Sequence, residues 1–153
     1  MQLNFINKLL GSGFYTGYIP FASGTFGSLA GLIIYYIPGF EKPVIIIPAI
    51  IIFTVYGIYV GSQFEKVYGK DPAECTIDEI VGMWISLLFL PKILWVSIAV
   101  FLLWRLSDII KPYPARQLEK LHGGTGIMID DIISSFYVLL LVHLFILFYS
   151  SVS

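Results

Sequence analysis

The sequence predicts an all-α fold: a polytopic membrane bundle of about four to five hydrophobic helices, built as one integral-membrane domain over residues 1–153. Composition is the first reason, because 58% of the residues are hydrophobic and 12% are charged, whereas soluble domains average about 45–50% and about 25%. The second is the mean hydropathy of +0.87. The third is that the apolar runs are long and do not alternate with polar residues, which excludes the strands of a membrane barrel.

The chain opens with a short segment that we expect to form an amphipathic lead-in, followed by apolar segments of two lengths. A helix over residues 43–64 would be about 33 Å long, and residues 132–152, taken with the preceding turn as 127–149, would give about 34 Å, so both can cross a bilayer. Residues 27–38 and 80–90 are too short to cross alone. We expect these two segments to be short tilted spans or re-entrant helices.

A further apolar segment, residues 93–103, follows residues 80–90 after the pair Pro91-Lys92. Proline disfavours a helical conformation in the residue before it, and it has no backbone N–H to donate. The sequence therefore predicts a tight helical hairpin between these two segments.

The placement of Lys and Arg predicts a multi-pass orientation with the N-terminus in the cytoplasm and the C-terminus outside. With five apolar segments, the cytoplasmic side receives Lys8, Lys66, Lys70, Arg105, Lys111, Arg116 and Lys120. The other side receives only Lys42 and Lys92. This asymmetry follows the positive-inside rule. A re-entrant segment would reverse the expectation for the C-terminus but not for the cytoplasmic loops.

Charge and cysteine content exclude several classes of partner and cofactor. Nine Lys and Arg against ten Asp and Glu give a net charge of −1, so the chain has no basic field to attract nucleic acid. The single cysteine, Cys75, can form neither an internal disulfide nor a CxxC pair for metal or redox chemistry. We expect membrane lipids as surroundings and no nucleic-acid partner, and the sequence leaves the oligomeric state open.

The acidic residues fall into two groups. Those in loops, which we interpret as solvated, are Glu41, Glu65, Asp71, Glu74 and Glu119. Those embedded in apolar sequence are Asp78, Glu79, Asp108, Asp130 and Asp131. An ionised carboxylate at the centre of a membrane helix costs about 2.5 to 3.5 kcal/mol on insertion scales, so such a residue indicates function by default. In the predicted topology all the embedded acids lie at cytoplasmic helix ends and can converge on one site.

Two structural alternatives compete with a functional role for these acids. Thr76 and Glu79 have the spacing of a helix capping box. Asp130 and Asp131 follow a glycine-rich turn, where an acid in the first helical turn interacts favourably with the helix dipole. The doubling of the acids argues against both, because capping needs only one. Arg105 and Lys111 could likewise be cations that extend from helix ends to the membrane surface.

Two glycine-rich clusters accompany the acids. The first, residues 24–28 (GTFGS), places Thr25 and Ser28 just before an apolar helix, where backbone N–H groups can hold an anion. The second, residues 122–126 (HGGTG), places His122 and three glycines before the last apolar segment. Glycine allows a close approach of the backbone to a ligand.

A metal site that holds a phosphate explains this combination of residues. Several carboxylates suit a hard cation such as Mg²⁺, and Arg105, Lys111 and the glycine-rich amides suit a dianionic group. Bound Mg²⁺ and the two cations would stabilise an in-line displacement at phosphorus. A phosphocysteine mechanism is excluded because Cys75 is followed by TIDEIVG and not by a Cys-x5-Arg loop.

Four blocks of the sequence resemble the phosphatidylglycerophosphatase A family of bacterial membrane phosphatases, and the resemblance covers nearly the whole chain. The blocks are PFASGTFGSLAG at 20–31, TIDEIVGMWISL at 76–87, RLSDIIKPYPARQLEK at 105–120 and HGGTGIMIDDIISSFY at 122–137. The resemblance implies a helical fold in the bacterial inner membrane, Mg²⁺ dependence, and hydrolysis of phosphatidylglycerophosphate to phosphatidylglycerol and phosphate at a site facing the cytoplasm.

Residue by residue, the resemblance leads to three sets of predicted site residues. The predicted catalytic residues are Asp78, Asp108, Asp131 and His122. The predicted phosphate-binding residues are Thr25, Ser28, Arg105 and Lys111. The predicted metal ligands are Asp78, Glu79, Asp130 and Asp131. Which acid is a ligand and which is the general base stays open at this point, as does the number of metal ions.

Two other classes of function remain as alternatives. In an ion- or proton-coupled transporter, intramembrane carboxylates would form a relay across the bilayer. A non-catalytic interaction protein would use small residues for helix contacts and leaves the embedded acids unexplained. The clustering of acids near one membrane face, beside cations and glycines, favours the phosphatase.

Overall fold

The computed structural model describes residues 3–152, which form helices and connecting loops without a strand. The chain begins with α1 (Phe5–Gly11), where the Asn4 side chain accepts a hydrogen bond from the Asn7 N–H at 2.7 Å and so caps the helix. A short 3₁₀ turn, η1 (Thr16–Tyr18), leads to α2 (Ser23–Tyr35). The predicted amphipathic lead-in is therefore a separate short helix.

The remaining helices, except the short α6, follow the predicted apolar segments closely. They are α3 (Pro43–Tyr68), α4 (Ile77–Ser86), α5 (Leu94–Ile110), α6 (Ala115–Leu118) and α7 (Gly124–Val152). α4 and α5 form the predicted hairpin, with Pro91-Lys92 in its loop. α5 extends to Ile110, seven residues beyond the predicted segment at 93–103, and α7 begins earlier than residue 127, at Gly124. The extension of α5 brings Asp108 into a helix, whereas the extension of α7 adds only residues 124–126.

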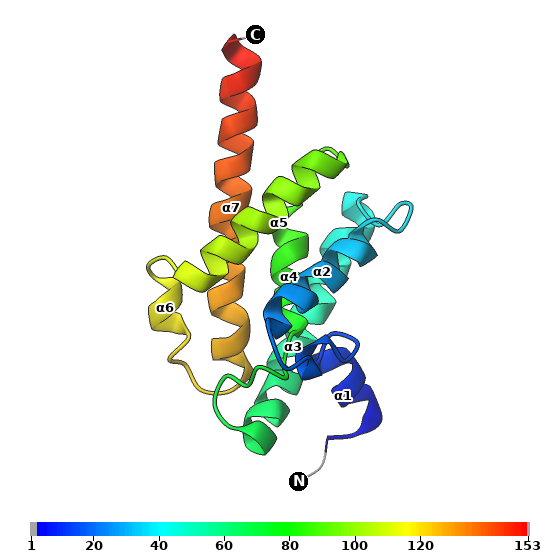
Figure 1. The fold of residues 1–153 in the computed structure, drawn as a ribbon, viewed down its shortest axis with the longest axis vertical. Helices are drawn as coiled ribbons and strands as arrows, with labels where there is room; N and C mark the ends of the chain where they lie inside the picture. Colours follow the sequence, from blue (N-terminus) through cyan, green and yellow to red (C-terminus); the bar gives the residue numbers. More distant parts are fainter. Residues whose placement is uncertain (1–2, 153) are drawn as a thin grey trace.

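α3 and α7 are long and apolar enough to cross a membrane, judged by length and composition. α5, with 17 residues, would be about 26 Å long, and α2 and α4 are shorter. Most of the α3 and α7 surface is apolar and exposed, which suits contact with lipid. In Figure 1 the C-terminal half of α7 projects beyond the rest of the bundle, and the two chain termini lie at opposite ends.

α4 is the central helix of the bundle. All of its residues except Glu79 are buried, and Figure 1 shows it enclosed by the other helices. One side of α4, with Ile77, Val81 and Ile85, packs into a cluster with α3 and α7. The other side contributes Ile80 and Trp84 to a cluster with α2 and α5. Spacings of three and four residues place these two sets on different faces of one helix.

Small residues bring α3 and α7 close together. Gly57 and Gly61 on α3 form a GxxxG pattern of the kind that lets membrane helices approach closely. A Cβ atom on Gly61 would lie 2.9 Å from the Gly124 Cα, and one on Gly124 would lie 2.1 Å from the Ile58 carbonyl oxygen. This close approach fixes the start of α7 against α3, and with it the position of the acids one turn further along.

Candidate active site

A polar cavity of about 240 Å³ lies where the start of α2, the loop before α4, the start of α4, the end of α5 and the second turn of α7 meet. Its lining residues are Ser23, Gly24, Asp71, Pro72, Ala73, Cys75, Thr76, Asp78, Glu79, Asp108, Lys111, Asp130 and Asp131. We call this cavity the acidic pocket. The structure thus brings together all the acids that the sequence embeds in apolar helices.

Most carboxylates of the acidic pocket are buried, and several of their oxygens lack a hydrogen-bond partner. Asp78, Asp108, Asp130 and Asp131 are buried. Among the described residues, Asp78 Oδ1, Asp130 Oδ1 and Asp131 Oδ2 have no hydrogen-bond partner. Burial of an unpaired carboxylate is costly. Carboxylates with unpaired oxygens that line one cavity are what a site for a cation requires.

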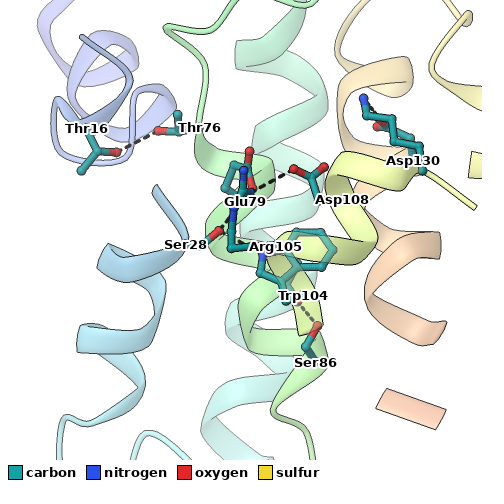
Figure 2. A network of polar contacts seen from close by, with 11 residues as sticks. Thr16, Ser28, Thr76, Glu79, Ser86, Trp104, Arg105, Asp108 and Asp130 are labelled. Carbon is teal, nitrogen blue, oxygen red and sulfur yellow. Dashed lines mark hydrogen bonds and ion pairs between the residues drawn. The ribbon is translucent and has the colours of Figure 1, made fainter. Parts of the chain in front are cut away.

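Arg105 is held by two of the acids and does not line the pocket. Its Nη1 donates to Glu79 Oε2, lies 3.0 Å from Asp108 Oδ2, and donates to Ser28 Oγ at 3.3 Å. Ser28 is fully buried, donates to Glu79 Oε2 at 3.2 Å, and accepts a hydrogen bond from Trp104 Nε1 at 3.0 Å. Figure 2 shows this network, in which side chains of α2, α4 and α5 meet. Arg105 and Ser28 therefore position Glu79 and Asp108.

Lys111 is the cation that lines the acidic pocket. It follows the last residue of α5 in a left-handed conformation, and its Nζ donates to Asp130 Oδ2 at 2.7 Å and lies 3.3 Å from Glu119 Oε1 and 4.0 Å from Asp71 Oδ2. Burial alone would lower the pKa of Lys111, but the bond to Asp130 and the surrounding carboxylates raise that pKa above its ordinary value. Lys111 therefore carries its charge throughout the physiological pH range.

Three carboxylates are spaced closely enough to share a metal ion. One oxygen from each of Glu79, Asp108 and Asp131 lies within 4.8 Å of the others. Ligands on opposite sides of Mg²⁺ lie about 4 Å apart, so small side-chain movements would complete such a site. The group differs from the predicted ligand set, because Asp108 takes the place of Asp78 and Asp130, which line the same pocket.

Besides Arg105 and Ser28, two further predicted site residues do not line the acidic pocket. Thr25 does not line the acidic pocket. The residues just before it at the start of α2, Ser23 and Gly24, line the pocket instead. His122 is exposed in the turn before α7 and is not among the lining residues. Of the glycines that follow it, Gly124 and Gly126 pack against backbone, since a Cβ on Gly126 would lie 2.2 Å from the Leu121 carbonyl oxygen, and Gly123 packs against the Ser62 side chain. They serve helix packing and do not face the acidic pocket.

Asp71 is a lining residue that sequence reasoning missed. It was interpreted as a solvated loop acid, but the loop before α4 folds back so that its carboxylate lies near Lys111. Nothing in its local sequence distinguishes it from the other loop acids. Glu119, also interpreted as solvated, pairs with Lys111 at the rim.

The structure also tests the two structural alternatives for the acids. The Thr76 side chain makes no capping hydrogen bond. Its Oγ1 lies 3.0 Å from Thr16 Oγ1 instead, so the capping box is not formed. Because α7 begins at Gly124, its first turn contains no acid, and Asp130 and Asp131 lie in the second turn. Neither residue occupies the position where the helix dipole would account for it.

Buried carboxylates around a lysine and an arginine, within a bundle whose two longest helices are long and apolar enough to cross a membrane, define an α-helical membrane protein with a buried acidic site. Within this class, residues 9–146 match the family model described as Phosphatidylglycerophosphatase A. The chain belongs to this family and is an enzyme, a phosphoric monoester hydrolase. The family resemblance in the four sequence blocks is confirmed.

Individual relatives cover most of the chain. A Bacteroides thetaiotaomicron protein, whose name provisionally assigns it phosphatidylinositol-3-phosphatase activity, is 37% identical over 147 residues, 91% of this chain and 92% of its own. The phosphatidylglycerophosphatase A of Escherichia coli is 37% identical over 82% of this chain and 75% of its own. That of Haemophilus influenzae is 38% identical over 88% and 85%. No solved structure matches the chain.

Proposed function

We propose that this enzyme is a Mg²⁺-dependent phosphatase that hydrolyses phosphatidylglycerophosphate to phosphatidylglycerol and inorganic phosphate. The observation that carries the proposal is the charge of the acidic pocket, whose lining holds six carboxylates and one lysine. A pocket of this charge attracts cations and repels a phosphate group until cations are bound. Membership of the phosphatidylglycerophosphatase A family and the named activity of two relatives support the substrate.

The residues in and around the pocket have three different roles in this proposal. Glu79, Asp108 and Asp131 would hold the metal ion, which supplies charge neutralisation and a more acidic water. Lys111 and the backbone at the start of α2 would face the phosphate oxygens. Arg105 holds Glu79 and Asp108 in place.

The chemical step transfers the phosphoryl group to water. Asp78, which lines the pocket and has an oxygen without a hydrogen-bond partner, would accept a proton as a water oxygen bonds to phosphorus. The bond between phosphorus and the glycerol oxygen breaks, and this oxygen takes up a proton, so the products are phosphatidylglycerol and inorganic phosphate. Burial of the carboxylates keeps the charged groups in a low-dielectric site, where they act more strongly than in water.

The same proposal includes the location of the site. We place the enzyme in the bacterial inner membrane as a multi-pass protein, with the acidic pocket at the cytoplasmic side. In Figure 1 the loop from α3 to α4 and the loop from α6 to α7 lie at the end of the molecule where the N-terminus lies. These loops and their flanks carry Lys66, Lys70 and Lys120, which supports a cytoplasmic position for that end.

The structure supports a transporter less well than a phosphatase. A relay would need ionisable residues along a path through the bundle, whereas the carboxylates of α4, α5 and α7 gather in one pocket. Beyond Ser135, the described part of α7 contains no Asp, Glu, Lys or Arg, and its one histidine is His143. His143 Nδ1 lies 2.8 Å from the Leu139 carbonyl oxygen of its own helix.

The proposal is tested by phosphate release from purified protein with phosphatidylglycerophosphate and, in parallel, with phosphatidylinositol 3-phosphate. We expect turnover of the first lipid with Mg²⁺, loss of turnover with a chelator, and recovery when Mg²⁺ is restored. Full turnover in chelator-treated, metal-free protein would exclude the metal mechanism. A preference for phosphatidylinositol 3-phosphate would assign the substrate of the Bacteroides relative instead.

A further inference from the structure

Three further cavities continue from the acidic pocket along the outside of the bundle. The first, of about 500 Å³, is lined by Ile110, Lys111, Tyr113, Arg116, Gln117 and Lys120, and we call it the cationic cavity. The other two, of about 200 Å³ and about 440 Å³, are almost entirely apolar and lie between α5 and α7. We call these two the α5–α7 groove. In Figure 1, α5 and α7 diverge from the end near α6 towards the C-terminal end of α7.

Each cavity shares lining residues with the next. Lys111 lines both the acidic pocket and the cationic cavity. Ile110 lines both the cationic cavity and the nearer part of the α5–α7 groove. Leu103 and Leu141 line both parts of the groove. The four adjoining cavities therefore follow one another in the order of carboxylates, cations and apolar side chains.

We propose that these cavities form one binding track for a glycerophospholipid whose headgroup carries both a phosphodiester and a terminal phosphomonoester. The phosphomonoester enters the acidic pocket, the phosphodiester lies in the cationic cavity, and one acyl chain occupies the α5–α7 groove. The order of environments matches the order of chemical groups along such a lipid. The inference rests on the proposed function and extends it to the rest of the substrate.

The cationic cavity suits an anion that is not the reacting one. Lys111, Arg116 and Lys120 line it, and no carboxylate is among its lining residues, in contrast to the acidic pocket. Arg116 Nη2 donates to the Ile110 carbonyl oxygen at 3.2 Å. This bond holds the guanidinium beside the end of α5, next to the entrance of the groove, and leaves further N–H groups for phosphate oxygens.

The length and exposure of the α5–α7 groove suit an acyl chain. Along α7 its lining runs from Tyr137 to Ile146, a span of nine helical steps that rises about 14 Å. This is close to half of the bilayer's hydrocarbon thickness, which is about 30 Å. Leu141, in the middle of the groove, is 56% exposed. A chain that enters beside Ile110 therefore stays within one leaflet, the leaflet on which the headgroup is bound.

The first experiment fills the groove and measures kinetics on full-length protein in detergent. Leu141→Trp is compared with Leu140→Trp, because Leu140 is on the same helix, is 58% exposed and does not line the groove. The substrates are long-chain and dihexanoyl phosphatidylglycerophosphate. We expect Leu141→Trp to raise KM for the long-chain substrate by about tenfold, with the short-chain substrate and the Leu140→Trp enzyme little changed. Equal kinetics of the two variants would mean that the groove holds only surrounding lipid.

The second experiment isolates the phosphodiester with two inhibitors of the same reaction. Phosphatidylglycerol carries the phosphodiester without the phosphomonoester, and inorganic phosphate addresses the acidic pocket alone. Arg116→Gln should weaken inhibition by phosphatidylglycerol by about tenfold and leave inhibition by phosphate unchanged. Lys66→Gln, at an exposed cation outside the track, should alter neither.

The outcomes separate this inference from the function on which it rests. A wild-type enzyme that releases no phosphate from phosphatidylglycerophosphate contradicts the proposed function. A wild-type enzyme that is active, with Arg116→Gln inhibited by phosphatidylglycerol as strongly as the wild type, overturns the phosphodiester site. Circular dichroism and size-exclusion chromatography establish that each variant is folded.

Discussion

At the scale of single residues, the carboxylates of the acidic pocket oppose the stability of the fold. Asp78 and Asp131 are buried, and each has an oxygen without a hydrogen-bond partner among the described residues. Like charges in a low-dielectric site repel one another, and each loses its hydration. A ligand that binds these carboxylates would offset this free-energy cost, and a binding site therefore explains why they are buried here.

We therefore expect Asp78→Asn and Asp131→Asn each to lose activity without losing stability. Loss of a metal ligand or of its partner commonly costs about 10- to 100-fold in affinity or activity. Removal of a buried negative charge should leave Tm unchanged or raise it. Phosphate release and thermal unfolding in detergent measure the two effects. Glu74→Gln, at a loop acid outside the pocket, is the control. Near-normal turnover by both Asn variants would show that the acidic pocket is not the active site.

Arg105 offers a second prediction, because one guanidinium nitrogen serves Glu79, Asp108 and Ser28 together. In Arg105→Lys the charge remains, but an ammonium cannot reproduce the planar set of donors. We expect activity to fall by about tenfold or more, with a higher Mg²⁺ concentration for half-maximal rate, because the carboxylates would be less well placed. A higher substrate KM with an unchanged Mg²⁺ requirement would instead indicate direct contact between Arg105 and phosphate.

The embedded acids were predictable from the sequence and their neighbours were not. A carboxylate within an apolar helix needs a partner, so TIDEI, RLSDII and GIMIDD indicate a site by themselves. Whether Thr25 or Ser23 faces the pocket depends on where α2 begins, and this is set by the left-handed conformation of Ala22. The path of the loop that carries Asp71 to Lys111 depends on tertiary contacts that no local pattern encodes.

At the scale of helices, the buried position of α4 explains why a segment too short to cross a membrane is strongly apolar. Hydropathy predicted its existence and its hairpin with α5, because both depend on local sequence. Hydropathy could not predict that α4 lies inside the bundle, since a helix that faces lipid and one that faces protein have the same composition. The extension of α5 past residue 103 was missed because Arg105 and Asp108 interrupt the apolar run.

Substitution by Ala should have different effects at Gly24, which faces α4, and at Gly82, which lies in α4. A Cβ on Gly24 would lie 2.1 Å from Glu79 Oε1 and 2.9 Å from Arg105 Nη2, whereas one on Gly82 would lie 2.3 Å from the Trp104 ring. Gly24→Ala displaces the flexible ends of side chains in the site, so activity should fall with Tm nearly unchanged. Gly82→Ala meets a rigid buried ring and should destabilise the fold by about 1–3 kcal/mol.

Thermal unfolding and phosphate release on the same preparations separate these two effects. A destabilised Gly24→Ala with normal activity would show that the Glu79 and Arg105 side chains do not need their present positions for turnover. A Gly82→Ala variant with the wild-type Tm would show that α4 and α5 can move apart without cost.

At the scale of the whole molecule, the charged loops divide between its two ends. Figure 1 places the α2–α3 and α4–α5 loops at the end away from the N-terminus. These two loops are joined by the ion pair between Lys92 Nζ and Glu41 Oε2, at 2.8 Å. The predicted split of cations therefore corresponds to a physical separation within the fold, with Lys42 and Lys92 in the loops of one end.

The native cysteine leaves this orientation open to a direct test. Cys75 is 5% exposed, and burial, with the nearby charge of Asp78, raises the pKa of its thiol well above the ordinary value. Because the thiolate is the reactive form, Cys75 should not react with a maleimide in folded protein. It should react after denaturation in SDS, which makes the wild-type protein the background control.

On this background, Lys42→Cys and Lys70→Cys place a thiol at each end of the molecule, both at exposed positions. With a membrane-impermeant maleimide on intact spheroplasts, we expect Lys42→Cys to be labelled and Lys70→Cys to be labelled only after the membrane is opened, because the end rich in Lys and Arg should face the cytoplasm. Labelling of Lys70→Cys from outside would invert the orientation. The acidic pocket would then face away from a cytoplasmic substrate, and the proposed access of the lipid would fail with it.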